Sequence, residues 1–187
     1  MKAGGINMAE SNITKKALST SMKKLMMEKP FSKIRISDIC DDCGMNRKSF
    51  YYHFMDKYDL VNWIFDTEFI EVNLRQKDQP VWSLLEPLCH YLDSERQFYC
   101  SALEISGQNS FSEHFTEMMR SLLEADMHRI MGEATNDFYV NFIADALILA
   151  IKRWIMEMPN VSADEFIDMI RVVVVRTAES VLDKINE

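Results

Sequence analysis

The feature that most constrains the fold of this chain is the spacing of its few helix-breaking residues. Only five Gly and four Pro occur in 187 residues, and most fall between segments whose apolar residues recur every three or four positions. Leu18, Met22 and Leu25 show this helical spacing near the N-terminus. We find no strand-like alternation, and the valine run 172–175 keeps the helical spacing of its flanks. The sequence therefore predicts an all-α protein.

Capping residues set the ends of the predicted helices. Side chains of Ser, Asn and Asp accept hydrogen bonds from the first N–H groups of a helix, whereas Gly and Pro end one. The predicted N-caps are Ser11 or Asn12, Ser37, Asn46 and Asp56, and two capping boxes follow, Ser110 with Glu113 and Ser162 with Glu165. The predicted helices span residues 14–28, 38–43, 47–54, 57–74, 79–94 (kinked or split by Pro87), 95–106, 110–132, 136–158 and 162–184.

The formal charge of −8 is distributed unevenly along the chain. Residues 1–60 carry eleven Lys or Arg and seven Asp or Glu, a formal charge of +4, whereas residues 61–187 carry ten and twenty-two, a charge of −12. This asymmetry favours an anionic partner for the N-terminal part alone. We expect a cytoplasmic protein with reduced thiols and no membrane association. Residues 1–10 lack the apolar run of a secretory signal, and the apolar stretch 142–151 is too short to span a bilayer.

Residues 37–54 have the form of a helix-turn-helix. Two short helices, each preceded by a capping residue, are joined by a turn that contains Gly44. At 100° per residue, the second helix places Phe50, His53 and Phe54 on one side, suited to packing. Its other side carries two cations and two phenols, suited to phosphates and base edges: Arg47, Lys48, Tyr51 and Tyr52. This pattern predicts a DNA-binding module.

The stretch 14–60 resembles the DNA-binding domain of TetR-type transcription regulators. The matching residues are Ile36, Asp38-Ile39, Cys-Gly-Met-Asn at 43–46, Tyr51, His53-Phe54, Lys57 and Leu60. The resemblance implies that Tyr51, Lys57 and the Thr14 end of the first helix contact phosphates. It also implies that Arg47, Lys48, Ser49 and Tyr52 approach the bases. His53, which is part of the matching motif, is a further candidate for DNA binding. Lys48, where a small residue is common, and Pro30, in place of a frequent Gly, depart from the family pattern.

The resemblance also implies a longer C-terminal domain that receives a signal and dimerises. We expect a flexible arm at 1–9, a three-helix DNA-binding domain at 10–56 and an antiparallel helical effector and dimerisation domain at 57–187. The stretches 50–54 and 56–65, with the later Phe142 and Trp154, are similar to those of the family branch that contains a dihydroxyacetone-kinase operon activator. The predicted partners are double-stranded DNA, a second copy of the chain, and a small-molecule effector or protein co-regulator. The residues expected to line an effector pocket, or else plain core, are Phe98, Phe115, Met119, Phe142 and Trp154.

Two alternative functions remain open from the residues alone. The first is a metal-responsive regulator that uses Cys89, His90, His114 and His128. The second is a protein-interaction module without DNA binding, although the retained Arg47, Lys48 and Tyr51 favour DNA. The pair Cys40 and Cys43 has zinc or redox spacing, but no second close pair follows and no strand precedes it, which favours buried thiols. No catalytic motif indicates an enzyme, and we predict no cofactor or metal.

Overall fold

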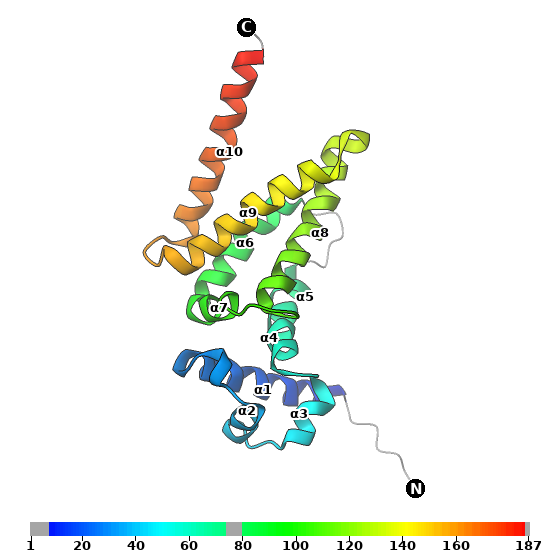
Figure 1. Cartoon of the computed structure of the whole chain (residues 1–187), viewed down its shortest axis with the longest axis vertical. Coiled ribbons are helices and arrows are strands. Elements are labelled where there is room, and N and C mark those ends of the chain that lie inside the picture. The colour runs from blue at the N-terminus through cyan, green and yellow to red at the C-terminus, as the bar shows by residue number, and fades with distance from the viewer. Residues whose placement is uncertain (1–7, 74–79, 186–187) are drawn as a thin grey trace. The chain divides into compact units, whose positions relative to one another are not determined.

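The computed structural model describes residues 8–73 and 80–185, and within these ranges the chain is helical, with no strand (Figure 1). The all-α prediction is therefore confirmed. The elements are α1 (Met8–Glu28), the 3₁₀ turn η1 (Phe31–Lys33), α2 (Ile36–Asp42), α3 (Arg47–His53), α4 (Lys57–Phe65), the π-helical turn η2 (Asp66–Ile70), α5 (Glu71–Asn73), α6 (Val81–Ser94), α7 (Arg96–Leu103), α8 (Phe111–Met131), η3 (Gly132–Ala134), α9 (Asp137–Glu157) and α10 (Ala163–Ile185).

The chain forms two compact units, which we describe separately. The first unit contains α1 to η2, most of α7 and the start of α8 up to Glu117. The second unit contains α6, the remainder of α8, α9 and α10. Segments distant in the sequence therefore fold together within each unit.

Three of the six predicted helix caps are present in full. The Asn46 side chain accepts the Ser49 N–H at 2.9 Å and starts α3. Asp56 accepts the N–H groups of Tyr58 and Asp59 at 2.8 and 2.9 Å and starts α4. In the second unit, the Ser162 hydroxyl accepts the Glu165 N–H, and the Glu165 carboxylate accepts the Ser162 N–H. The predicted capping box before α10 is therefore confirmed.

Two predicted helix starts and one predicted capping box differ in the structure. Helix α1 begins at Met8, so Ser11 and Asn12 lie inside it, because the preceding Met-Ala-Glu are good helix formers. Helix α2 begins at Ile36 rather than after Ser37, because the Asp38 carboxylate accepts the Arg35 N–H at 3.1 Å. In the predicted box before α8, Ser110 accepts the Glu113 N–H, but the Glu113 carboxylate accepts the N–H of Asn109. The predicted end of the fourth helix, at residue 74, lies outside the described residues.

An aromatic cluster forms the core of the first unit outside the helix-turn-helix. The Phe65 ring lies 5.3 Å from Phe111, 5.4 Å from Phe69 and 6.0 Å from Tyr99, measured between centroids. All four side chains are buried. Because they come from α4, η2, α7 and α8, the cluster joins these elements into one core with the helices that precede them.

A histidine–aspartate pair links α8 to the π-helical turn of the same unit. The Nε2 atom of His114 lies 2.7 Å from the Asp66 carboxylate. This hydrogen bond raises the pKa of His114, and burial opposes the rise. Since a raised pKa in the folded state means that the protonated ring favours folding, the pair stabilises the fold most at acidic pH.

We therefore expect His114→Gln to lower the free energy of unfolding more at pH 5.5 than at pH 8.5. The stabilisation by His114 is fully present below the ordinary histidine pKa of about 6.5 and is lost as pH rises through the higher folded value. Urea unfolding of both proteins across this range measures the difference, with the exposed His128→Gln as control. An equal loss of stability at both pH values would refute the charged pair.

The second unit is organised around a two-faced α9. Its buried face includes Ala144, Ile151 and Trp154, whereas Phe142, 63% exposed, lies on the opposite face. Trp154 stacks on Phe166 of α10, with ring centroids 4.6 Å apart and planes within 4°. Beyond this contact, the side chains of Arg171–Thr177 are all exposed, although Val174 and Val175 still border a groove with Trp82 and Leu85 of α6. Figure 1 shows the C-terminal part of α10 projecting past α6 and α9.

The turn from α9 to α10 is held by the guanidinium of Arg96. It donates hydrogen bonds to the carbonyls of Trp154 and Val161 at 3.0 Å and to those of Ile155 and Met158 at 3.3 Å. It also lies 4.7 Å from the Trp154 ring centroid and donates to Asp93 at 2.8 Å. One side chain thus satisfies the carbonyl end of α9 and fixes the point where α10 begins.

Candidate nucleic-acid interface

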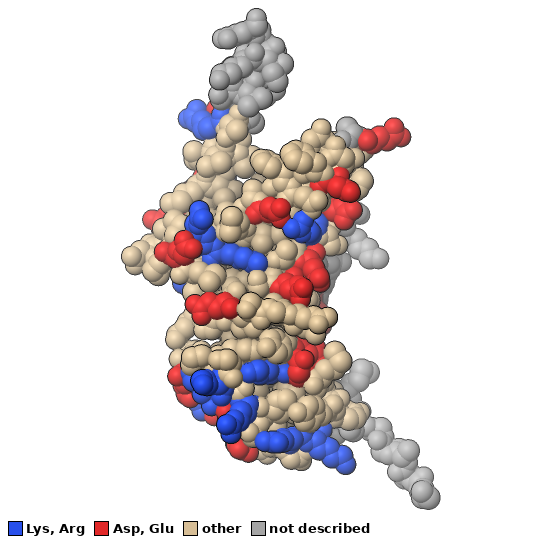
Figure 2. Space-filling view, viewed as in Figure 1, with Lys and Arg blue, Asp and Glu red and all other residues tan. Residues whose placement is uncertain are grey.

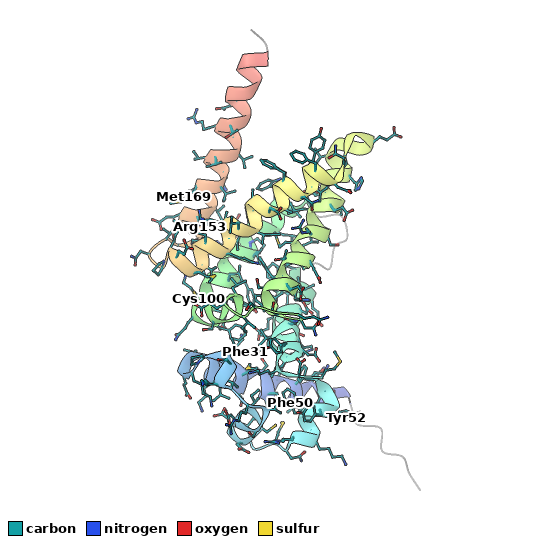
Figure 3. All side chains as sticks on the ribbon, in the orientation of Figure 1. Phe31, Phe50, Tyr52, Cys100, Arg153 and Met169 are labelled. Atoms are coloured by element: carbon teal, nitrogen blue, oxygen red, sulfur yellow. The ribbon has the colours of Figure 1, made fainter. Side chains whose placement is uncertain are left out.

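Helix α3 exposes the face that the sequence assigns to DNA. Tyr51 and Tyr52 are 58% and 64% exposed, and Arg47 and Lys48 are exposed beside them. Phe50 on the opposite face is fully buried, and Figure 3 labels it together with Tyr52. The predicted division of α3 into a packing side and an exposed side is therefore confirmed.

The turn before α3 is fixed by local backbone geometry. Gly44 has a φ of +68°, a conformation that side-chain-bearing residues adopt at a cost, and the Met45 N–H donates to the Cys40 carbonyl at 2.8 Å. Cys40 is buried, which raises the pKa of its thiol, and the Cys43 thiol donates to the Ile39 carbonyl at 3.2 Å. Both cysteines are free thiols that pack in the turn, so they help to set the angle at which α3 is presented.

Lys57 at the start of α4 contacts the protein itself. Its ammonium donates to the carbonyls of Phe31 and Ile34 at 2.7 and 2.9 Å and lies 4.1 Å from the Phe31 ring centroid. Burial lowers the pKa of Lys57. An ammonium has three N–H donors, and two of them serve these carbonyls, so a phosphate contact would use the third.

The remaining DNA-binding candidates differ in their surroundings. Thr14 is half-buried inside α1 rather than at its start. The Ser49 N–H and hydroxyl both donate to the Asn46 side chain, so Ser49 is part of the helix cap. The His53 ring packs edge-on against Tyr52 with centroids 4.9 Å apart, and burial, with a smaller effect of Lys15, lowers its pKa. His53 is therefore suited to positioning Tyr52 as a neutral ring.

Lys and Arg side chains gather on the visible face of α1 to α3, whereas Asp and Glu are spread over the rest of that face (Figure 2). Several of these cations are paired: Lys24 with Asp42 at 2.5 Å, Lys29 with Asp38 at 2.6 Å and Lys23 with Glu68 at 2.6 Å. Among the described residues, no ion pair involves Arg47 or Lys48. No spacing pattern in the sequence indicates the first two pairs, which join residues eighteen and nine positions apart.

The five residues expected to line an effector pocket take separate structural roles. Phe98 and Phe115 are buried in the first unit, whereas Met119 and Trp154 are buried in the second. Phe142 is exposed on α9, where its ring stacks on Phe138 at 6.2 Å. Within the second unit, a fully buried Trp154 and an exposed Phe142 do not face one space.

The Cys and His residues of the metal-responsive alternative are engaged separately. Burial, with a smaller effect of Asp93, raises the pKa of Cys89 to about 12. His90 lies 3.1 Å from Asp164, and His114 pairs with Asp66. Across residues 8–73 and 80–185, no cluster of three His, Cys, Asp or Glu has a geometry that could hold a metal ion.

The capped turn, the buried face and the exposed cationic face of α3 define a helix-turn-helix DNA-binding protein. The profile described as "Bacterial regulatory proteins, tetR family" matches residues 22–64, and that described as "Transcriptional regulator C-terminal region" matches residues 82–175. The chain belongs to the TetR family of transcriptional regulators, with an N-terminal DNA-binding domain and a C-terminal ligand-binding domain.

A curated relative is the HTH-type dhaKLM operon transcriptional activator DhaS of Lactococcus lactis. It is 31% identical over 125 residues, which span 66% of this chain and 66% of that protein. Among solved structures, a dihydroxyacetone kinase operon activator DhaS matches with a TM-score of 0.65 and 24% identity, over 88% of this chain and 96% of that one. NalD of Pseudomonas aeruginosa, a repressor of a multidrug efflux pump, matches with a TM-score of 0.65 and 17% identity, over 90% and 96%. Both solved structures share the fold of this chain. A separate observation is that no helix in the described ranges is long and apolar enough to cross a membrane.

Proposed function

We propose that this chain is a homodimeric regulator that binds a palindromic operator in the cytoplasm through α3, and that a signal received outside the helix-turn-helix changes its DNA affinity. The observation that carries the proposal is the exposed face of α3, where two cations without ion pairs lie beside two exposed tyrosines. A helix with these groups near its N-terminal end is suited to the major groove.

The proposed contacts fall into two groups. Arg47, Lys48, Ser49 and Tyr52 lie on or beside the exposed face and are assigned to base edges. Tyr51, Lys57 and Thr14 are assigned to phosphates, and His53 supports Tyr52. Base contacts carry sequence preference, whereas phosphate contacts carry affinity and its salt dependence.

Selection from a random duplex library tests this function directly. Purified full-length chain should enrich an inverted repeat whose half-site centres are about 10–11 base pairs, or a multiple of that spacing, apart. Enrichment of a single half-site would refute dimeric binding, and no enrichment at all would refute the regulator proposal.

Exposed apolar side chains on α9 and α10 support the dimer. On α9 they follow one stripe, and on α10 they surround the helix: Phe138, Phe142, Leu149, Met156, Met169, Val172, Val173, Val174 and Val175. A helix with apolar residues nearly all round is typically buried on more than one side. Two such helices from each of two copies would form a four-helix bundle.

We expect Leu149→Glu combined with Val173→Glu to convert the dimer to a monomer at about 10 μM, because two buried charges per subunit cost several kcal/mol in an apolar interface. Light scattering coupled to size exclusion measures the mass. Gln108→Glu, which adds a charge at an exposed position of the first unit, should stay dimeric. A wild-type chain that is monomeric at this concentration would contradict the proposed interface.

A further inference from the structure

A cavity of about 560 Å³ opens within the first unit, where the C-terminal end of α1 faces η1, the start of α4 and α7. Its lining includes Met26, Met27 and Glu28 of α1, Phe31 of η1 and Tyr58 of α4. Phe31, one of these lining residues, is labelled in Figure 3. The volume lies within the range of about 300–1,000 Å³ typical of small-molecule sites.

The charged groups that line this cavity leave it acidic. Glu28 lines it from α1, and Glu104 lines it from the residue after α7. No ion pair joins either carboxylate to a cation among the described residues. Lys29, the one cationic residue of the lining, is paired with Asp38 at 2.6 Å. The lining therefore carries two carboxylates and one cation that is already paired, while Lys24, outside the lining, interacts electrostatically with Glu28.

The ends of two helices add to this negative potential. Helix α1 ends at Glu28 and α7 ends at Leu103, so both direct their carbonyl ends to this region. The C-terminal end of a helix carries a partial negative charge of roughly half an electron. The nearby Lys57 is not part of the lining, and its ammonium is turned to the carbonyls of Phe31 and Ile34.

We propose that this cavity binds a small organic cation, an amine with an apolar or aromatic body. Its ammonium would pair with Glu28 and Glu104, and its body would contact the thioether side chains of Met26 and Met27 and the side chain of Ile105. Thioethers adapt to ligands of irregular shape, and the Tyr58 ring offers a further surface for a cation.

An occupied cavity would connect the DNA-binding helices to α7. Without a ligand these elements already meet in two polar contacts: the Gln97 amide donates to the Met27 carbonyl at 3.5 Å, and the Lys23 ammonium lies 5.7 Å from the Phe98 ring centroid. A ligand held by Glu28 and Glu104 would add a further bridge between these elements and bias the placement of α1, against which α3 packs. This effect on DNA affinity rests on the proposed function, whereas the binding itself does not.

Three ligands of similar shape and different charge test the proposal: phenethylammonium, the neutral 2-phenylethanol and the anionic phenylacetate. Full-length protein labelled with ¹³C at its methionine methyls is titrated without DNA, so failure of binding is distinguishable from failure of operator recognition. We expect saturable shifts at Met26 and Met27 with the cation, little change at Met169 of α10, and binding weaker by about tenfold or more for the neutral and anionic ligands.

The double variant Glu28→Gln and Glu104→Gln should weaken cation binding by about tenfold or more, as expected for removal of charge-assisted hydrogen bonds. Its matched control is Glu124→Gln with Glu133→Gln, which removes two exposed carboxylates from the second unit and should bind the cation as wild type does. Equal binding of all three ligands, unchanged binding by the first variant, or shifts confined to methionines outside the cavity would each overturn the proposal.

Discussion

Replacing Arg96 with alanine is expected to lower the free energy of unfolding by about 3–5 kcal/mol, the range for breaking a largely buried charged network. The guanidinium is 17% exposed and serves four carbonyls at the end of α9 and in the turn that follows. Alanine would remove one donor from each of these carbonyls, although those of Trp154, Met158 and Val161 keep another. It would also leave the Asp93 carboxylate with the Ala163 N–H but no guanidinium, and the Trp154 ring without its cation. The destabilisation combines the loss of these charge-assisted hydrogen bonds with the loss of the cation–π interaction.

Urea unfolding followed by circular dichroism, at one fixed protomer concentration, measures this change. Arg153→Ala is the matched control, because Arg153, labelled on α9 in Figure 3, is 61% exposed and lies 3.5 Å from Glu157 in its ion pair. Its replacement should change stability by less than about 0.5 kcal/mol. If both variants are destabilised by the same amount, the Arg96 hydrogen bonds contribute no more than a surface ion pair does.

Replacing Arg47 or Lys48 with alanine is expected to weaken operator binding by about 1–3 kcal/mol and to relax the preference at one position of each half-site. Lys57→Ala should act differently and weaken all duplexes alike, reducing the salt slope by about one for each phosphate that Lys57 neutralises. Since Lys57 also holds the carbonyls of Phe31 and Ile34, its variant should be less stable as well.

Titrations of the selected operator and of a scrambled duplex at several salt concentrations separate these effects. Arg153→Ala again serves as the control, since it removes one cation from the second unit. Retention of operator affinity by all three variants would exclude α3 as the element that enters the groove, and the protein-interaction alternative would then be preferred.

The parts of the fold that depend on neighbouring residues could be predicted from the sequence. The caps of Asn46 and Asp56 each act within three residues, and the two sides of α3 follow from helical periodicity alone. The start of α1 could not be predicted in this way, because two adequate caps, Ser11 and Asn12, compete with good helix formers that precede them. The strong propensity of those residues extends the helix.

The parts that depend on distant residues could not be predicted. Arg96 meets carbonyls 58 to 65 positions away, and His114 meets a carboxylate 48 positions away, so no local pattern marks either. The candidate DNA-binding face lies on one helix, whereas the cavity beside Glu28 is lined by three separate segments of the chain. The exposure of single aromatic residues could not be predicted either. Phe115 and Phe142 both lie in helices rich in apolar residues, but Phe115 is buried and Phe142 is exposed.

The four consecutive valines of α10 have a consequence for how the chain is made in the cell. β-branched residues are poor helix formers, and this run is exposed on every side of the helix. A newly synthesised chain without a partner would carry a short, uncharged, β-prone stretch of the type that initiates aggregation. Assembly would then protect the chain as well as arrange it on DNA, and subunits made in excess or unable to pair would be the ones that chaperones and proteases remove.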